Sequence, residues 1–133
     1  MPAKLGGSTN KNLTTKSKGD AAEDLALAHL QAAGLKLLER NYRTPGRGGG
    51  EIDLIMRDVE GTLVFVEVRQ RSGAMHGGAA ASISVTKQKR IIFAARRYLM
   101  RLGQPPACRF DVVLLEGQEQ SHITWLKAAF DAF

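Results

Sequence analysis

The sequence predicts an α/β fold in which helices pack against a central mixed β-sheet, and three observations support this prediction. The chain has 133 residues, a length typical of a single domain. Segments 20–33 and 84–102 repeat apolar residues with helical periodicity. Runs rich in β-branched and aromatic residues, such as 62–71, are typical of strands. The expected order of elements is α-β-β-β-α-β-β, which is typical of a layered α/β domain.

The composition is that of an ordinary globular protein, with 44% hydrophobic and 24% charged residues. It excludes a disordered chain and a fibrous one. No apolar run approaches the roughly 18 residues that a membrane span requires, so we expect no membrane partner. Cys108 is the single cysteine, which excludes an internal disulfide and argues against a structural zinc cluster. The N-terminus has lysines but no apolar stretch of the signal-peptide type, so we expect a cytoplasmic protein.

The N-terminal part predicts a basic arm and then a helix. Residues 1–18 are mostly small and polar with four lysines, which is typical of a disordered arm, so the folded domain would span 19–133. The helix over 20–33 begins near Asp20, whose charge suits the positive end of the helix dipole. Glu23 does not join the other acids of this helix, because the helical wheel places it at the edge of the apolar side.

The next part predicts three strands. Residues 35–43 form an edge strand that becomes polar, and TPGRGGG at 44–50 is typical of a flexible loop. EIDLIMR over 51–57 and TLVFVEVRQR over 62–71 alternate their side chains between two faces. The turn sequence DVEG lies between them. The spacing of these two segments therefore predicts a β-hairpin.

The C-terminal half predicts the second helix and two more strands. Residues 72–83 are rich in Gly and Ala and indicate a mobile loop near a site. The helix over 84–102 follows, and Pro105-Pro106 interrupts the chain after it. CRFDVVLLE over 108–116 predicts a buried strand and 122–126 a short one, after which KAAFDAF closes the chain as a helical turn.

Positive charge is concentrated in the middle of the chain, where residues 61–110 contain nine Lys and Arg residues and Glu67 as the single acid. Six of these bases lie on the helix over 84–102, which has no acid for i,i+4 pairing. Clustered bases are typical of a polyanion binder, and the alternative is a solvated helix face. The N-terminus of this helix adds a preference for anions. The residues predicted to contact nucleic acid are Lys87, Gln88, Lys89, Arg90, Arg97 and Arg101.

Two acids interrupt the apolar strands of the predicted hairpin. Asp53 lies in EIDLI and Glu67 in FVEVR. An unpaired buried carboxylate is costly, and two neighbouring carboxylates also repel each other. A divalent cation relieves both penalties, and Mg²⁺ prefers such oxygen ligands. Arg69 shares a strand face with Glu67 and can hold a phosphate or a water beside the metal. A buried ion pair is the alternative for each residue alone, but the three together beside the basic helix favour a metal site.

The spacing Asp53-x(13)-Glu67-x-Arg69 resembles the PD-(D/E)xK nuclease signature, with arginine in the lysine position. Longer segments, among them GDAAEDLALAHL, GGGEIDLIMRD, LVFVEVRQRS and WLKAAFDAF, are similar to the bacterial YraN-type family. The resemblance runs from about Gly19 to Phe133. It implies a restriction-endonuclease-like fold related to archaeal Holliday-junction resolvases, and therefore a nuclease-like domain.

The resemblance also implies a catalytic site with a divalent metal, Mg²⁺ or Mn²⁺. Asp53 and Glu67 match the metal-binding acids of the signature. Glu23 matches a helix glutamate that completes the site, either as a direct metal ligand or through water. Arg69 matches the catalytic lysine, but an arginine stays charged and cannot act as a base. It can still position water or stabilise charge on the phosphate.

The function that follows from the resemblance is that of a metal-dependent endonuclease acting on structured or branched DNA. Because resolvase-like relatives act on two-fold symmetric junctions, it also implies a homodimer. Arg69 motivates an alternative, a catalytically silent DNA-binding or adaptor module that retains the nuclease fold. A weaker alternative is a protein-interaction domain whose positive charge is coincidental.

Overall fold

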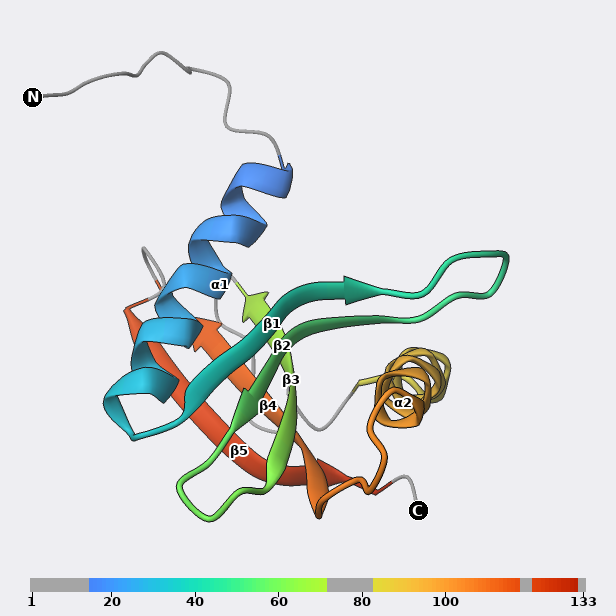
Figure 1. The fold of residues 1–133 in the computed structure, drawn as a ribbon. Helices are drawn as coiled ribbons and strands as arrows, with labels where there is room; N and C mark the ends of the chain where they lie inside the picture. The colour runs from blue at the N-terminus through green and yellow to red at the C-terminus, as the bar shows by residue number, and fades with distance from the viewer. Residues whose placement is uncertain (1–14, 72–82, 118–120, 132–133) are drawn as a thin grey trace, which may run out of the picture.

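The structure, a computed structural model, describes residues 15–71, 83–117 and 121–131. It is a single α/β domain in which a five-stranded sheet lies between two helices (Figure 1). The elements in chain order are α1 (Thr15–Ala32), β1 (Lys36–Arg43), β2 (Glu51–Arg57), β3 (Leu63–Arg71), α2 (Val85–Met100), β4 (Cys108–Glu116) and β5 (His122–Phe130). This order confirms the predicted fold class.

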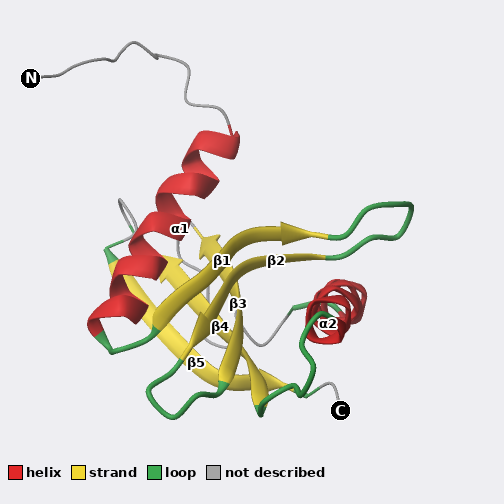
Figure 2. Ribbon diagram, in the orientation of Figure 1, coloured by secondary structure: helices red, strands yellow, loops and turns green. Residues whose placement is uncertain are grey.

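The sheet is mixed, as predicted, and its strands lie in the order β1-β2-β3-β4-β5 (Figure 2). β1, β2 and β3 form an antiparallel meander, in which β2 and β3 are the predicted hairpin. β3 and β4 are parallel because α2 lies on the crossover between them. β5 returns antiparallel to β4. The two strands that carry the acids of the predicted site are therefore neighbours in the inner part of the sheet.

The two helices pack on opposite faces of the sheet, because the strands alternate their apolar side chains between the faces. The α1 residues buried on one face, spaced four apart, are Ala22, Ala26 and Leu30, and the strand residues in this cluster include Leu54, Met56, Val64 and Val66. The α2 residues buried on the other face are Ile91, Ala94 and Ala95, and the strand residues in that cluster include Ile55, Leu63, Phe65 and Phe110. Each helix thus presents only a narrow apolar stripe.

The helix boundaries differ from the predicted ones at the N-terminus. α1 begins at Thr15, so its first turn belongs to the segment predicted as the basic arm, and residues 1–14 lie outside the described part. The helix is followed by Gly34, whose φ of 100° suits a helix stop. Apart from the buried Ile83, the predicted loop over 72–83 also lies outside the described residues. Within the described ranges, neither helix combines the length and the apolarity that crossing a membrane requires.

The predicted strand over 122–126 was confirmed, but the helical turn predicted after it was wrong over residues 127–130. These residues continue β5, whose last residue, Phe130, stacks on Phe110 of β4 with ring centroids 5.0 Å apart. Ala128 has a positive φ of 51° and donates its backbone N–H to Asp111 Oδ1 at 2.9 Å. The apolar residues of this segment therefore pack along a neighbouring strand, where pairing with β4 replaces helical hydrogen bonds.

Candidate functional site

The two acids of the predicted site lie opposite each other where β2 and β3 separate. The antiparallel pairing of these strands ends at Leu54↔Val66, and the next step in the same register joins Asp53 and Glu67. At that position Val68 N donates to Asp53 Oδ2 at 2.8 Å, so a carboxylate accepts the hydrogen bond that a strand carbonyl would otherwise accept. Asp53 is 8% exposed and Glu67 is 6% exposed. The fold thus brings together two carboxyls that are nearly removed from water.

Burial and mutual repulsion set the protonation of this pair. Burial, with the charge of Asp53, raises the pKa of the Glu67 carboxyl to about 8. Burial also raises the pKa of Asp53, and the hydrogen bond from Val68 opposes this rise. The two side chains are within hydrogen-bonding reach, so they share a proton when no cation lies between them. In the described part of the chain, no protein group donates to the buried Glu67 Oε1.

Asp111 shows how the same fold accommodates a buried acid with a structural role. This residue is fully buried, and its carboxylate accepts hydrogen bonds from Arg109 Nε at 3.0 and 3.2 Å. Trp125 Nε1 and Ala128 N each donate to it at 2.9 Å. Glu67 has no comparable set of donors among the described residues. A satisfied structural ion pair, the alternative reading of the acids, therefore describes Asp111 better than Glu67.

Two cations approach Glu67 from different elements. Arg69, two residues further along β3, lowers the pKa of Glu67 through its charge, and its buried Nε has no hydrogen-bond partner among the described residues. Lys87 lies in the first turn of α2, where Nζ is 3.7 Å from Glu67 Oε2. Ser84 caps this turn by accepting a hydrogen bond from Lys87 N at 3.0 Å. The sequence placed Lys87 on a basic helix but could not show this contact, which depends on where α2 meets β3.

Glu23 faces the acid pair from α1. The charge of Asp53 and burial of its own side chain both raise the pKa of Glu23, with burial the larger cause. Its Oε1 lies 3.4 Å from Arg40 Nε, and the same guanidinium pairs with Asp24 at 2.7 Å. No set of three or more His, Cys, Asp or Glu side chains among the described residues is placed to hold one metal ion. The structure thus brings Glu23 near the pair without making it a third direct ligand.

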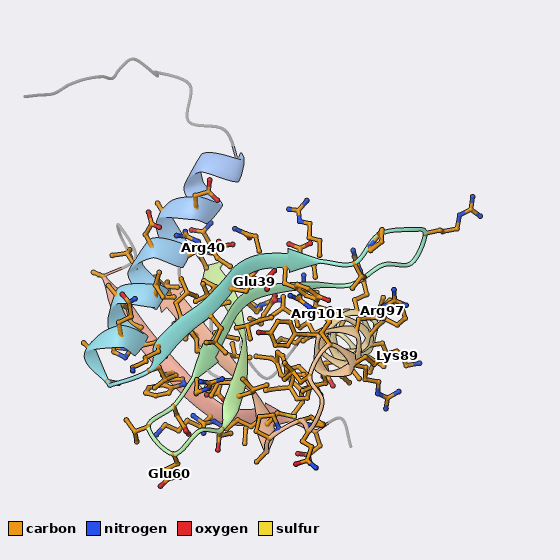
Figure 3. The ribbon with its side chains drawn as sticks, in the orientation of Figure 1. Glu39, Arg40, Glu60, Lys89, Arg97 and Arg101 are labelled. Atoms are coloured by element: carbon orange, nitrogen blue, oxygen red, sulfur yellow. The ribbon has the colours of Figure 1, made fainter. Side chains whose placement is uncertain are left out.

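Three of the predicted nucleic-acid contacts on α2 are available to a partner. Lys89, Arg90 and Arg97 are exposed, and Figure 3 shows Lys89 pointing away from the sheet. Arg90 also donates from Nε to the carbonyl oxygen of Gly49 at 3.2 Å, which joins α2 to the loop between β1 and β2. This side of α2 therefore presents positive charge next to that loop.

Two more of the predicted contacts, Gln88 and the exposed Arg101, have partners within the fold. Gln88 Nε2 donates to the carbonyl oxygen of Ile83 at 3.0 Å, which helps to fix the start of the helix. Arg101 Nη1 lies 3.6 Å from Glu39 Oε1 (Figure 3). The Arg101 guanidinium is also 5.1 Å from the ring centroid of Tyr98. Helical spacing could not predict the contact of Arg101 with Glu39, because Glu39 lies on β1.

Comparison with known proteins relates most of the chain to one family. The pattern of Uncharacterised protein family UPF0102 matches residues 22–115. A UPF0102 protein of Albidiferax ferrireducens is 74% identical over 119 residues, covering 90% of this chain and 91% of its own length. A UPF0102 protein of Polaromonas naphthalenivorans is 66% identical over 128 residues, covering 92% and 84%. Among solved structures, Pyrococcus furiosus SfsA in complex with Ca²⁺ aligns with 97% of this chain and 75% of that chain, at 16% identity and a TM-score of 0.37.

Proposed function

This chain belongs to the uncharacterised protein family UPF0102, and we propose that it is a divalent-metal-dependent endonuclease acting on structured or branched DNA. The observation that carries the proposal is the buried pair of Asp53 and Glu67, in which Glu67 Oε1 has no hydrogen-bond donor among the described residues. Two such carboxylates suit a cation with oxygen ligands. The exposed bases of α2 beside the pair suit a phosphate backbone.

The residues present fit Mg²⁺ or Mn²⁺ held by Asp53 and Glu67, with Glu23 contributing through water. When bound, such an ion activates a water for attack on phosphorus and neutralises charge on the phosphate oxygens. Asp53 and Glu67 would hold such an ion best at a pH where Glu67 has lost its proton. Arg40, which contacts Glu23, keeps the α1 side of the site in a fixed geometry.

The cations of the site have separate roles in this proposal. The Arg69 guanidinium orients the scissile phosphate or the attacking water, and because it stays charged it does not take a proton from that water. Lys87, on α2, places a second positive charge beside the Glu67 carboxylate. The Lys87 ammonium therefore contacts the phosphate as charge develops on it.

The experiment that tests the function compares wild type with Asp53→Asn. The amide keeps the size of the side chain and an oxygen for Val68 N but removes the charge that holds a cation. We expect wild type to take up Mn²⁺ in a calorimetric titration and to cut a branched DNA, and Asp53→Asn to do neither. The exposed Glu60, in the turn between β2 and β3, gives the control variant Glu60→Gln, which should behave as wild type (Figure 3). Cutting by Asp53→Asn, in a preparation free of other nucleases, would overturn the assignment of the site.

The alternative function is a DNA-binding or adaptor module without turnover, and it is favoured by one observation, the arginine at position 69 in place of lysine. The same variants separate the two functions. If wild type binds DNA with a steep salt dependence but takes up no Mn²⁺, and Asp53→Asn binds DNA equally well, the protein is a binding module.

A further inference from the structure

The loop between β1 and β2 and the adjoining helix α2 enclose a polar groove of about 460 Å³, which we call the arginine groove. Its lining includes Arg43, Thr44, Glu51 and Arg90, together with glycines of the loop. Figure 1 shows this loop extending from the sheet alongside α2. The groove lies outside the pair of acids but begins only two residues before Asp53 on the same strand.

The loop is held in place by its own hydrogen bonds. Thr44 is buried, its Oγ1 accepts a hydrogen bond from Gly50 N at 2.6 Å, and its N–H donates to the carbonyl oxygen of Gly50 at 3.0 Å. Gly50 also lies so close to α2 that a Cβ there would be 2.1 Å from the carbonyl oxygen of Arg90. Gly49 accepts a hydrogen bond from Arg90 Nε on the same helix. The groove is therefore a built feature of the fold.

The charges of the groove favour an anion. Arg43 from β1 and Arg90 from α2 are exposed and contribute two guanidinium groups, whose fork geometry matches phosphate oxygens. Glu51 is the one acid in the lining, and its Oε2 is 3.9 Å from Arg43 Nη2, too far for a hydrogen bond. A phosphate with good geometry can therefore compete with Glu51 for Arg43.

The arginine groove and the acid pair are joined by one face of α2. Lys87 and Arg90 are three residues apart, so they share that face and are separated by about 4.5 Å along the helix axis. Lys87 contacts Glu67 of the acid pair, and Arg90 contacts Gly49 of the β1–β2 loop. The residues of α2 that contact the acid pair and the loop therefore lie within one turn of the helix.

We infer that the arginine groove binds a phosphodiester group of the same nucleic-acid strand, next to the phosphate at Asp53 and Glu67. This inference rests on the proposed function, since it requires a nucleic-acid strand at the acid pair. The groove would position the strand, so that the scissile phosphate lies over the acids while the flanking phosphate is held by Arg43 and Arg90. Such contacts fix register on the substrate without reading its bases.

The test measures DNA affinity as a function of salt, by fluorescence anisotropy of a labelled four-way junction with EDTA present. Arg43→Ala should lower the slope of log affinity against log salt by about 0.9, the value for one lost phosphate contact. Arg57→Ala is the matched control, because this exposed arginine lies at the opposite end of β2 from the groove. Glu51→Gln should raise the affinity, because it removes the carboxylate that competes for Arg43. Circular dichroism checks that each variant is folded.

The outcomes distinguish the groove from the nuclease. If Arg43→Ala and Arg57→Ala show the same slope of log affinity against log salt while wild type cuts DNA, phosphate binding in the arginine groove is overturned and the proposed nuclease function stands. If the slope of log affinity against log salt is smaller for Arg43→Ala while wild type neither binds Mn²⁺ nor cuts DNA, the arginine groove binds phosphate but the protein is a binding module without turnover. If wild type binds no DNA at any salt concentration, both proposals are overturned.

Discussion

Glu67 links the chemistry of the site to the stability of the fold. Its pKa is raised to about 8 in the folded protein, because the carboxyl is buried beside Asp53. In the unfolded chain a glutamate titrates near its ordinary pKa of about 4.3. Between these two pH values the folded state keeps a proton that the unfolded state has released. The free energy of unfolding contributed by Glu67 is therefore fully present below the lower value and is lost as pH rises through the higher one.

Substituting Glu67 tests this linkage directly. In wild type without divalent ions, we expect the free energy of unfolding to fall by up to about 1.4 kcal/mol per pH unit between about pH 5 and pH 8, the slope for one proton. Glu67→Gln should lose most of this dependence, and the remainder would come from the raised pKa of Asp53. Urea unfolding at several pH values measures both proteins. Parallel stability curves would show that Glu67 is not buried with a raised pKa.

Lys87 differs from the other bases of α2 in touching the acid pair. Its charge lowers the pKa of both Asp53 and Glu67, so Lys87→Met should shift the pH midpoint of Mn²⁺ uptake upward. Loss of one preorganised charge at the phosphate should slow cleavage about 10²–10³-fold. Lys89→Met removes the same charge from the exposed side of the same helix, so it should leave the midpoint of Mn²⁺ uptake near wild type and slow cleavage much less than Lys87→Met does. Equal effects of the two substitutions on cleavage would mean that Lys87, like Lys89, only contacts the DNA phosphate backbone and has no special role at the acid pair.

At the scale of elements, the entry of β2 into the sheet depends on backbone contact with α2. A Cβ on Gly50 would lie 2.1 Å from the carbonyl oxygen of Arg90 and 2.9 Å from the backbone nitrogen of Ala94. Backbone atoms cannot move aside as a flexible side chain can, so Gly50→Ala should destabilise the protein by about 1–3 kcal/mol. Gly103→Ala is the control, because its added Cβ meets nothing within 4 Å, and its effect should stay within about 0.5 kcal/mol. Equal urea midpoints for the two variants would contradict this close contact.

Elements set by local patterns were predictable, and those set by distant partners were not. The alternation around Leu54 and Phe65 predicted the hairpin and its two faces, because side-chain direction along a strand has a period of two. The wheel placed Glu23 at the edge of the buried side, where the structure has it half-buried. Residues 127–130 were expected to form a helical turn but continue as strand, since their hydrogen bonds and their packing come from β4. Long-range pairing of this kind leaves no periodic signal in a short segment.

The candidate site also contains some contacts that the sequence could predict and others that it could not. Asp53 and Glu67 were predictable as neighbours, because a hairpin register places them opposite each other. The contact of Lys87 with Glu67, the pairing of Arg40 with Glu23 and the arginine groove were not predictable. Each of these depends on where a helix meets a strand or a loop. Helical periodicity gives the buried face of a helix but not its position along the sheet.

At the scale of the whole molecule, the two helices differ in charge. α1 contains three acids and two lysines, whereas α2 contains five bases and no acid. These helices cover opposite faces, and the acid pair lies between them at the separation of β2 and β3. The Arg40 guanidinium partly neutralises the α1 acids by pairing with Glu23 and Asp24, so a polyanion is attracted mainly to the α2 side. This asymmetry orients an approaching strand so that its phosphates pass Lys87 and Arg90.

Metal binding at the acid pair should stabilise the whole molecule, because an ion that binds the folded state alone adds its binding free energy to that of folding. Mn²⁺ at about 100 times its dissociation constant should raise the free energy of unfolding of wild type by about 2.7 kcal/mol. The gain should increase toward pH 8, where Glu67 loses the proton that competes with the ion. Thermal unfolding with and without Mn²⁺ measures it, with Glu60→Gln expected to match wild type and Asp53→Asn expected to gain nothing. Equal stabilisation of Asp53→Asn would mean that Mn²⁺ binds elsewhere, and the buried carboxyls would then be a proton-sharing pair without a metal.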